Sequence, residues 1–224
     1  MKGNSRPVVS NQIGCHPQLL QVVSRHCATP WRRPLADHSV RAFQAVLSRI
    51  EQDGRPLLLD AGCGTADSSL QLAERHPDKL VLAVDQSASR LSRCKARAEN
   101  LLLIRADLQD FWRLLYQAGL RLQHHYLLYP NPWPKKQHLQ RRWHGHPVFP
   151  WLLALGGVLE VRSNWWVYVE EFSRALAWLG IDSTSEPVDT PGLSPFERKY
   201  ALSGQRLWVL RADLRATAIA VPGL

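Results

Sequence analysis

Short apolar runs alternate with longer polar stretches through the middle of this chain. The runs cover residues 57–59, 80–84, 101–104, 126–129 and 158–161. Strands that are buried on both faces of a sheet have this appearance, because neither side of such a strand meets water. Strand–helix alternation at this interval predicts a mostly parallel sheet with helices on both faces. A last strand that can run antiparallel is expected over residues 206–214, at or near the edge.

The first part of the chain differs from the rest. Four prolines, at positions 7, 17, 30 and 34, interrupt any long helix there, although residues 18–26 are apolar enough for a short one. From His38 onward, apolar residues recur at helical spacing until the Asp53-Gly54 pair, which predicts an amphipathic helix that ends in a turn. With 224 residues in total, we expect an arm over residues 1–37 and one α/β domain over residues 38–224.

Several classes of protein are disfavoured by what the sequence lacks. No stretch approaches the ~20 apolar residues of a membrane span, and the start has no apolar signal region. The four cysteines form no CxxC pair, which predicts free thiols and a cytoplasmic protein. Cys15-His16 and His26-Cys27 match no common zinc-site spacing, so no metal is expected.

Basic residues gather in two blocks of a chain whose net charge is +9. Residues 1–49 carry seven lysines and arginines against Asp37 alone, and residues 132–146 carry four more with three histidines and no acid. Clustered positive charge is typical of proteins that bind a polyanion, because neutralised phosphates release their counterions. The blocks predict a nucleic-acid partner, while a purely solubilising role is the alternative.

A glycine-rich turn follows the first apolar run. Residues 60–65 read Asp-Ala-Gly-Cys-Gly-Thr, where Gly62 and Gly64 allow the main chain to approach a ligand at a helix N-terminus. Asp67 stands where a dinucleotide fingerprint has its third glycine, which disfavours a nicotinamide or flavin cofactor. Asp85 ends the second run and Asp107 follows the third, so Asp60, Asp85 and Asp107 are expected along one rim of the sheet. A capping role is the alternative for each of them.

This pattern resembles the class I S-adenosylmethionine-dependent methyltransferases. They share a D-x-G-x-G loop, an acidic residue after strand two for the ribose, and an acidic residue after strand three near the adenine. The resemblance implies a Rossmann-like, mostly parallel seven-stranded sheet and S-adenosylmethionine as cofactor. The cofactor-binding residues that it implies are Asp60, Gly62, Gly64, Asp85, Gln86, Asp107 and Leu108.

The segment after the fourth run is rigid and basic. Residues 129–138 read Tyr-Pro-Asn-Pro-Trp-Pro-Lys-Lys-Gln-His, and Arg141-Arg142 follow. The alternating prolines stiffen the chain, Trp133 offers a surface on which a base can stack, and the basic residues offer phosphate contacts. The segment resembles the P-D-P-W-x-K-x-x-H-x-x-x-R-R signature of the bacterial tRNA (guanine-N7)-methyltransferases. Residues 156–165 and 194–204 are similar to two later segments of that family, so the resemblance runs from about residue 57 to 213.

The resemblance implies transfer of a methyl group to N7 of a guanine in tRNA, with Asn131 as the catalytic residue. Substrate-binding residues would be Asn131, Lys135, Asn164, Ser194 and Glu197. The chain departs from the family at four of the motif positions. Asn131 and Asn164 replace aspartates, Asp60 replaces a glutamate and Ser194 replaces a threonine. Because asparagine brings no charge to balance the methylated ring, we expect a weaker or differently aimed enzyme.

Two other functions remain open at this level. Asn-Pro-Pro-aromatic loops mark enzymes of the same fold that methylate exocyclic amino groups, which favours an amino group of adenine or another base as the alternative target. This chain has Asn-Pro-Trp-Pro at 131–134, with the aromatic residue one place earlier. A non-catalytic RNA-binding protein that kept the fold is the third reading. Retention of Gly62, Gly64, Asp85 and Asp107 favours cofactor binding over that reading. The chain is expected as a monomer or homodimer.

Overall fold

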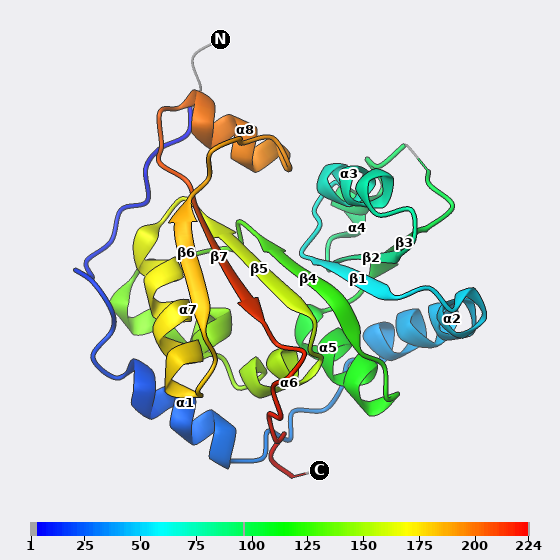
Figure 1. The fold of residues 1–224 in the computed structure, drawn as a ribbon, viewed down its shortest axis with the longest axis horizontal. Helices are drawn as coiled ribbons and strands as arrows, with labels where there is room; N and C mark the ends of the chain where they lie inside the picture. Colours follow the sequence, from blue (N-terminus) through cyan, green and yellow to red (C-terminus); the bar gives the residue numbers. More distant parts are fainter. Residues whose placement is uncertain (1–3, 96, 224) are drawn as a thin grey trace.

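A seven-stranded sheet forms the centre of the molecule (Figure 1), as seen in a computed structural model that describes residues 4–95 and 97–223. The strand order is β3-β2-β1-β4-β5-β7-β6. Strands β1 to β5 run parallel, and β7 is antiparallel to both β5 and β6. This confirms the predicted fold class. The strands are β1 (Leu57–Ala61), β2 (Leu80–Asp85), β3 (Leu101–Arg105), β4 (Leu122–Leu128), β5 (Val158–Ser163), β6 (Ser183–Pro187) and β7 (Trp208–Asp213).

Strand β4 is longer than the apolar run that predicted it, and strand β6 was not predicted. Strand β4 begins at Leu122, four residues before the run at 126–129. In its polar start Gln123 is exposed and His124 half-buried, while the fully buried His125 accepts a hydrogen bond of 3.1 Å from the indole N–H of Trp112. Strand β6 carries no apolar run, since it is an exposed edge strand that pairs on one side with β7. Edge strands need no second buried face, so their sequence signal is weak.

Helices cover both faces of the sheet. Alternate residues of β1 separate into two apolar clusters, with Leu57 and Leu59 in one and Leu58 in the other. The larger cluster includes Phe43, Phe111 and Phe172 from three different helices, while Leu58 packs with residues of α3. The helices are α1 (Leu19–Ala28), α2 (Asp37–Asp53), α3 (Asp67–Arg75), α4 (Ala88–Leu91), α5 (Leu108–Gln117), α6 (Phe149–Ala154), α7 (Trp166–Trp178) and α8 (Pro195–Leu202), with 3-10 turns η1 (Lys136–Arg141) and η2 (Trp143–Gly145).

The predicted helix before the sheet is present as α2. It ends at Asp53, and Gly54 adopts a positive φ of 69° and donates its N–H to the carbonyl of Ile50. A residue with a Cβ is strained in that conformation, which explains the glycine at the helix end. Helix α2 packs against α5 and β3, in the half of the sheet formed by β1, β2 and β3.

The N-terminal segment is folded along the domain. It runs from α8 past α7 to α1, as the blue trace in Figure 1 shows. Ser5 contacts the far end of the chain at both of its main-chain polar groups, which bond Ser203 Oγ and Gln205 Nε2 at 3.0 Å each. Helix α1, in the segment expected to hold a short helix, packs against α6 and α7. The arm is therefore part of the folded molecule.

Two predictions about the chain as a whole can be compared with the structure. Among the described residues, no helix has both the length and the apolar character that crossing a bilayer requires. Cys15, Cys27, Cys63 and Cys94 are all free thiols, as expected.

Candidate functional site

The glycine-rich turn after β1 folds over the end of β2. The N–H groups of Gly62 and Cys63 both donate to the carbonyl of Val84, at 2.8 and 3.0 Å. Gly62 and Gly64 have φ values of 83° and 61°, and a Cβ at Gly64 would meet no atom within 4 Å. These conformations favour glycine, and the absence of side chains leaves open space above the turn.

Asp85 is fixed at the end of β2 by three donors. Its Oδ2 accepts the N–H of Gly64 at 3.0 Å, and its Oδ1 accepts the N–H of Ser87 at 2.7 Å. The half-exposed Arg90 lies 3.2 Å from Oδ2. A carboxylate offers about four lone-pair positions, so Asp85 keeps acceptor capacity for a ligand although only 3% of it is exposed.

A cleft of about 700 Å³ opens between this turn and the segment after β4. Its volume falls in the ~300–1,000 Å³ range of small-molecule sites. The cleft joins residues of the predicted cofactor set to residues that follow β4 and to one face of α8. Its walls are Ala61, Gly62, Asp85, Gln86, Arg90, Asp107, Leu108, Gln109, Leu128, Tyr129, Pro130, Asn131, Pro132, Trp133, Arg141, Trp143, His146, Phe196 and Tyr200.

Asp107 begins α5 at the wall of the cleft. Its Oδ1 accepts the N–H of Gln109 at 3.2 Å as a helix cap, and its Oδ2 accepts from the Gln109 amide at 2.8 Å. Arg33 of the arm lies 3.6 Å from Oδ2. The capping alternative therefore applies to Asp107, but the residue also faces the cleft.

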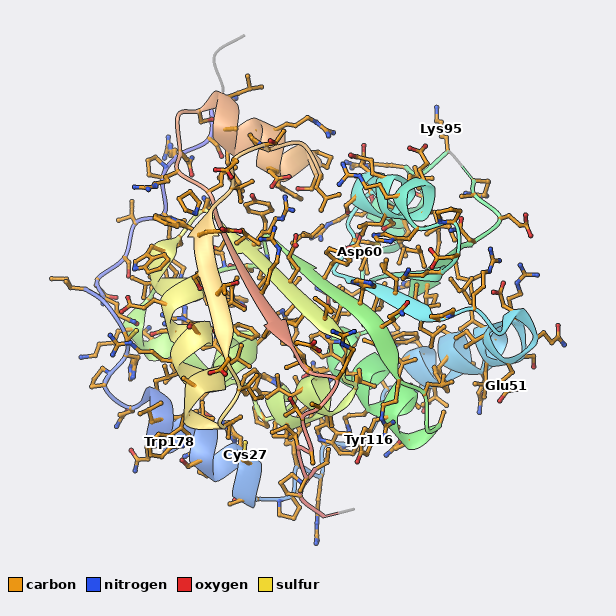
Figure 2. The ribbon with its side chains drawn as sticks, in the orientation of Figure 1. Cys27, Glu51, Asp60, Lys95, Tyr116 and Trp178 are labelled. Carbon is orange, nitrogen blue, oxygen red and sulfur yellow. The ribbon has the colours of Figure 1, made fainter. Side chains whose placement is uncertain are left out.

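Asp60 lies beneath the glycine-rich turn and does not line the cleft. Its Oδ2 accepts hydrogen bonds from Ser68 and Ser69 at 2.7 and 2.6 Å, and Asp60 is 1% exposed. Figure 2 shows it between β1 and α3. Burial raises the pKa of Asp60, although the two serine hydroxyls oppose the rise. Asp60 anchors the start of α3, which differs from the expectation that it faces a ligand.

The segment after β4 has a strained main chain on both sides of Asn131. Tyr129 and Trp133 adopt positive φ values of 53° and 45°. Such conformations cost about 1–3 kcal/mol each for residues other than glycine and concentrate at functional sites. Asn131 is exposed at the cleft, and its Oδ1 accepts the N–H of Trp133 at 3.3 Å.

Aromatic side chains form the outer part of the cleft. The Arg141 guanidinium lies 4.7 Å from the ring centre of Trp133. On the α8 side, Phe196 is 50% exposed and stacks with Tyr200 at 6.3 Å between ring centres. Burial lowers the pKa of His146 to about 4, so this cleft residue is neutral at pH 7. Sequence reasoning missed Phe196 and Tyr200, whose spacing of four residues within a helix was the available signal.

Ser194 and Glu197 support α8 instead of lining the cleft. Ser194 Oγ accepts the N–H of Glu197 at 3.2 Å and so caps the helix. Glu197 is fully buried; its Oε1 lies 2.6 Å from Arg162, and its Oε2 accepts the N–H of Leu193 at 2.6 Å. Both residues thus anchor α8, the helix that carries Phe196 and Tyr200.

Lys135 and Asn164 lie outside the cleft. The side chain of Lys135 is exposed beside the basic turn η1. The amide of Asn164 donates to Gln205 Oε1 at 2.8 Å, and Gln205 in turn bonds the arm at Ser5. Of the five predicted substrate residues, Asn131 is the one that lines the cleft.

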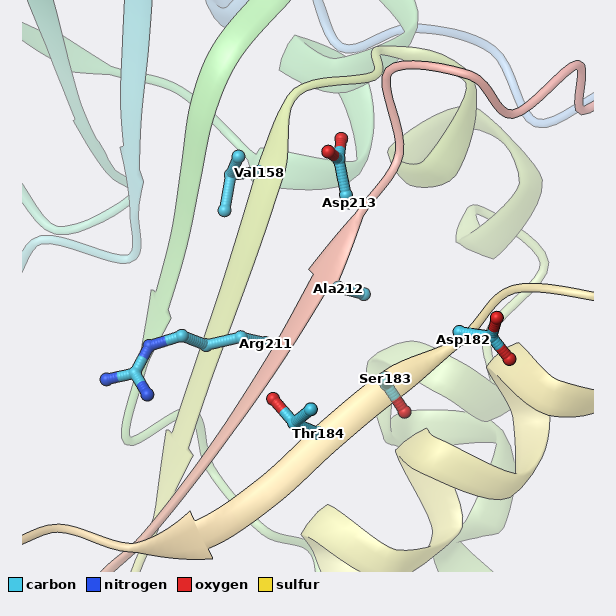
Figure 3. Close-up of a pocket in the computed structure, with 7 residues that line it drawn as sticks. All are labelled: Val158, Asp182, Ser183, Thr184, Arg211, Ala212 and Asp213. Carbon is cyan, nitrogen blue, oxygen red and sulfur yellow. The ribbon is translucent and has the colours of Figure 1, made fainter.

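A second, shallower hollow of about 360 Å³ lies at the other end of the sheet (Figure 3). It is formed where β5 and β6 begin and β7 ends, so it is far along the strands from the glycine turn. Residues 182–184, residues 211–213 and Val158 surround it. Within the part of the chain that is described, no group of three or more His, Cys, Asp or Glu side chains could hold a metal.

The model of a family described as putative methyltransferase matches residues 54–191. The chain belongs to this methyltransferase family. The match covers the glycine-rich turn, Asp85, Asp107 and the Asn131 segment, and it leaves the arm and α8 outside.

Several curated relatives of this methyltransferase are named tRNA (guanine-N(7)-)-methyltransferase. The tRNA (guanine-N(7)-)-methyltransferase of Photorhabdus laumondii is 28% identical over 163 residues, which are 68% of each chain. The protein of that name from Neisseria gonorrhoeae is 26% identical over 163 residues, again 68% of each chain.

Solved structures share the methyltransferase's fold at lower identity. The 16S rRNA (adenine(1408)-N(1))-methyltransferase from Catenulisporales acidiphilia has a TM-score of 0.54 and 19% identity, covering 82% of this chain and 96% of that one. The 16S rRNA methyltransferase KamB has a TM-score of 0.56 and 18% identity, covering 83% and 98%. A variant of the first enzyme was solved with its cosubstrate SAM.

Proposed function

We propose that this methyltransferase uses S-adenosylmethionine to methylate N7 of a guanine in tRNA. One observation carries the proposal: a single cleft joins Gly62, Asp85 and Asp107 to the Asn131–Trp133 segment. A methyl donor on the first wall and a base on the second would lie in the same cleft, as direct transfer between them requires. The curated relatives named tRNA (guanine-N(7)-)-methyltransferase support the choice of substrate.

The first wall fits S-adenosylmethionine. Asp85 has about one acceptor position left for a ribose hydroxyl, and the open space at Gly64 admits a ligand close to the main chain. Leu108 supplies an apolar surface and Asp107 a carboxylate beside it for the adenine. When bound, the cofactor supplies a methyl group on a positively charged sulfur.

The second wall fits a purine base. Guanine N7 has a free lone pair and no proton to lose, so the protein has to position the base and needs no general base. The side-chain oxygen of Asn131 accepts the N–H of Trp133, so the amide hydrogens of Asn131 are the groups that remain free to bind a base in the cleft. Trp133, Phe196 and Tyr200 provide faces for stacking, worth about 1–3 kcal/mol per base.

The charged surface around the cleft suits an RNA backbone. Arg90 and Arg141 line the cleft, and Lys135 and Lys136 are exposed on the adjoining turn. If these residues bind phosphates, affinity for tRNA should fall steeply between about 50 and 200 mM salt, because bound counterions are released on complex formation. A fluorescence-anisotropy titration with labelled tRNA at several salt concentrations measures this, and an unchanged affinity would refute the backbone contacts.

Methyl transfer to a defined RNA tests the proposal. Labelled S-adenosylmethionine is incubated with tRNA from bacteria that lack guanine-N7 methylation, and the nucleosides of the product are separated. N7-methylguanosine is the expected product. A methylated amino group would replace the proposal with the alternative that the Asn-Pro-Trp-Pro segment favours. Cofactor binding without transfer would refute tRNA as substrate, and a lack of cofactor binding would refute the enzyme.

A further inference from the structure

The main chain of the Trp133 segment is held from below by one buried side chain. Arg142 is fully buried, and its Nε and Nη2 donate to the carbonyl of Trp133 at 3.2 and 3.1 Å. Nη2 also lies 3.3 Å from the carbonyl of Lys135. The guanidinium rests 4.9 Å from the ring centre of Trp165. The carbonyl of Trp133, whose φ is positive, is therefore held by a side chain that lies outside residues 129–136.

Arg142 is itself fixed by a buried carboxylate. Its Nη1 lies 2.5 Å from Oε2 of Glu171 on α7, and both side chains are inaccessible to water. His144 Nε2 lies 2.9 Å from the same oxygen. Burial disfavours the charged carboxylate, but His144 and Arg142 outweigh it and lower the pKa of Glu171 to about 2. The Glu171 carboxylate is thus ionised across the neutral range, beside the guanidinium of Arg142.

The arm completes this cluster. The Gln12 side chain bridges the pair: its Nε2 donates to Glu171 Oε1 at 2.6 Å, and its Oε1 accepts from Arg142 at 3.0 Å. The N–H of His16 donates to the same Glu171 oxygen at 2.8 Å. The remaining acceptor positions of Glu171 and a donor of Arg142 are therefore satisfied by residues more than a hundred positions away in the sequence.

Two neighbours of Gln12 bind the segment directly. Ser10 Oγ donates to the carbonyl of Pro134 at 2.6 Å. Asn11 Oδ1 accepts the N–H of Lys136 at 3.0 Å. Arg142, Ser10 and Asn11 together bond one main-chain polar group of each of four consecutive residues, 133–136.

We propose that Gln12, Arg142 and Glu171 are positioning residues of the methyltransferase site, and that the arm sets the conformation of the segment against which the substrate base binds. This inference rests on the proposed function. It assigns residues 10–12 of the arm to the substrate side of the cleft. Ser10 and Asn11 bond the segment that contains Trp133, and Gln12 bonds the Arg142–Glu171 pair beneath it. The contact of the arm with the cofactor wall is made by a later residue, Arg33, at Asp107.

A purely stabilising role accounts less well for the cluster. Removing two charges from water offsets most of their attraction, so a buried ion pair is a weak source of stability. Directional hydrogen bonds to chosen carbonyl groups, by contrast, fix geometry. Here they act on a main chain held at a positive φ next to Asn131.

The substitution Gln12→Ala tests the proposal without removing a charge. Ile13→Ala is the matched control, because Ile13 is the next residue of the arm and is fully exposed. Three quantities are compared with the unaltered chain: amide hydrogen exchange over residues 131–137, kcat and KM for tRNA, and the Kd for S-adenosylmethionine by calorimetry. Arg142→Lys, which keeps the charge but loses the planar fork, is the second variant.

We expect faster exchange over residues 131–137 in Gln12→Ala and a fall in kcat/KM for tRNA of about 10- to 100-fold, the range caused by small misplacements of reacting groups. The cofactor Kd should change less than about twofold, since the hydrogen bonds of Gln12 reach Arg142 and Glu171 and no residue of the cofactor wall. Arg142→Lys should act in the same direction. Ile13→Ala should leave all three quantities unchanged.

Two results would overturn the proposal. One is unchanged exchange and unchanged kcat/KM in Gln12→Ala. The other is a loss of cofactor affinity equal to the loss in kcat/KM, which would indicate general destabilisation.

An unaltered chain without methyl transfer would refute the proposed function alone, because hydrogen exchange needs no turnover. Unchanged exchange in Gln12→Ala would then overturn the coupling of arm and segment, and faster exchange confined to residues 131–137 would uphold it.

Discussion

The phenolic oxygen of Tyr129 lies 3.0 Å from Oε1 of Glu197 and joins the exit of β4 to α8. Tyr129 donates this hydrogen bond, and burial together with the charge of Glu197 raises its pKa, so the phenol stays protonated. The same carboxylate oxygen lies 2.6 Å from Arg162 on β5. The exit of β4, strand β5 and helix α8 thus meet at one buried carboxylate.

Glu197→Gln should destabilise the fold by about 3–5 kcal/mol, because it leaves the charge of Arg162 without one of its partners in a buried site. Urea unfolding followed by tryptophan fluorescence measures the change. Glu186→Gln is the matched control. Glu186 also pairs with an arginine, Arg211, but it is 56% exposed, so about 0–1 kcal/mol is expected. Equal effects of the two substitutions would contradict the role given to Glu197.

Asp85→Asn should weaken S-adenosylmethionine binding by about 10- to 100-fold, because bonds to a charged acceptor are worth about 1.5–3 kcal/mol. The amide also presents one acceptor oxygen where Asp85 uses two, for Gly64 and Ser87. Calorimetric titration with the cofactor measures the effect. Asp78→Asn, at a 68% exposed side chain, removes the same charge and should leave the affinity unchanged. An unaltered Kd in Asp85→Asn would remove this residue from the site.

Asn131→Asp should raise the rate of guanine-N7 methylation by about tenfold or more, because a carboxylate would balance the positive charge that develops on the ring. Single-turnover rates with tRNA measure the chemical step. Gln137→Glu changes the charge by the same amount in the same exposed segment, and Gln137 is outside the cleft. A rate that rises equally in both variants would show a general electrostatic effect, and an unchanged or lower rate in Asn131→Asp would contradict the prediction.

His125 makes stability depend on pH. Burial lowers the pKa of His125 to about 3, while an unfolded histidine titrates near 6.5. Between these values the unfolded chain binds a proton that the folded chain does not, so this residue's contribution to stability falls by about 1.4 kcal/mol for each pH unit below 6.5. His125→Asn, which can still accept from Trp112, should lose that slope. Urea unfolding at pH 7, 6 and 5 measures the free energy of unfolding at each pH. The same dependence of this free energy on pH in the unaltered chain and in His125→Asn would disprove the prediction.

Local sequence determined the central strands of this protein and the turn that follows the first of them. Apolar runs buried on both faces were sufficient to predict the central strands, because the burial of a strand depends on its own composition. The glycine-rich turn could also be predicted, since Gly62 and Gly64 adopt conformations that few other residues accept. The placement of Asp85 and Asp107 at one edge follows from strand direction, because parallel strands bring their carboxyl ends together.

Tertiary structure decided which side chains face the cleft and which support it. Asp60, Ser194 and Glu197 occupy motif positions, yet their oxygens are engaged by neighbours in the fold. Phe196 and Tyr200 reach the cleft because of how α8 is docked. Gln12 meets Arg142 and Glu171 across more than a hundred residues. Such contacts depend on packing between distant elements, and no local pattern in the sequence encodes the direction in which a buried polar side chain finds its partner.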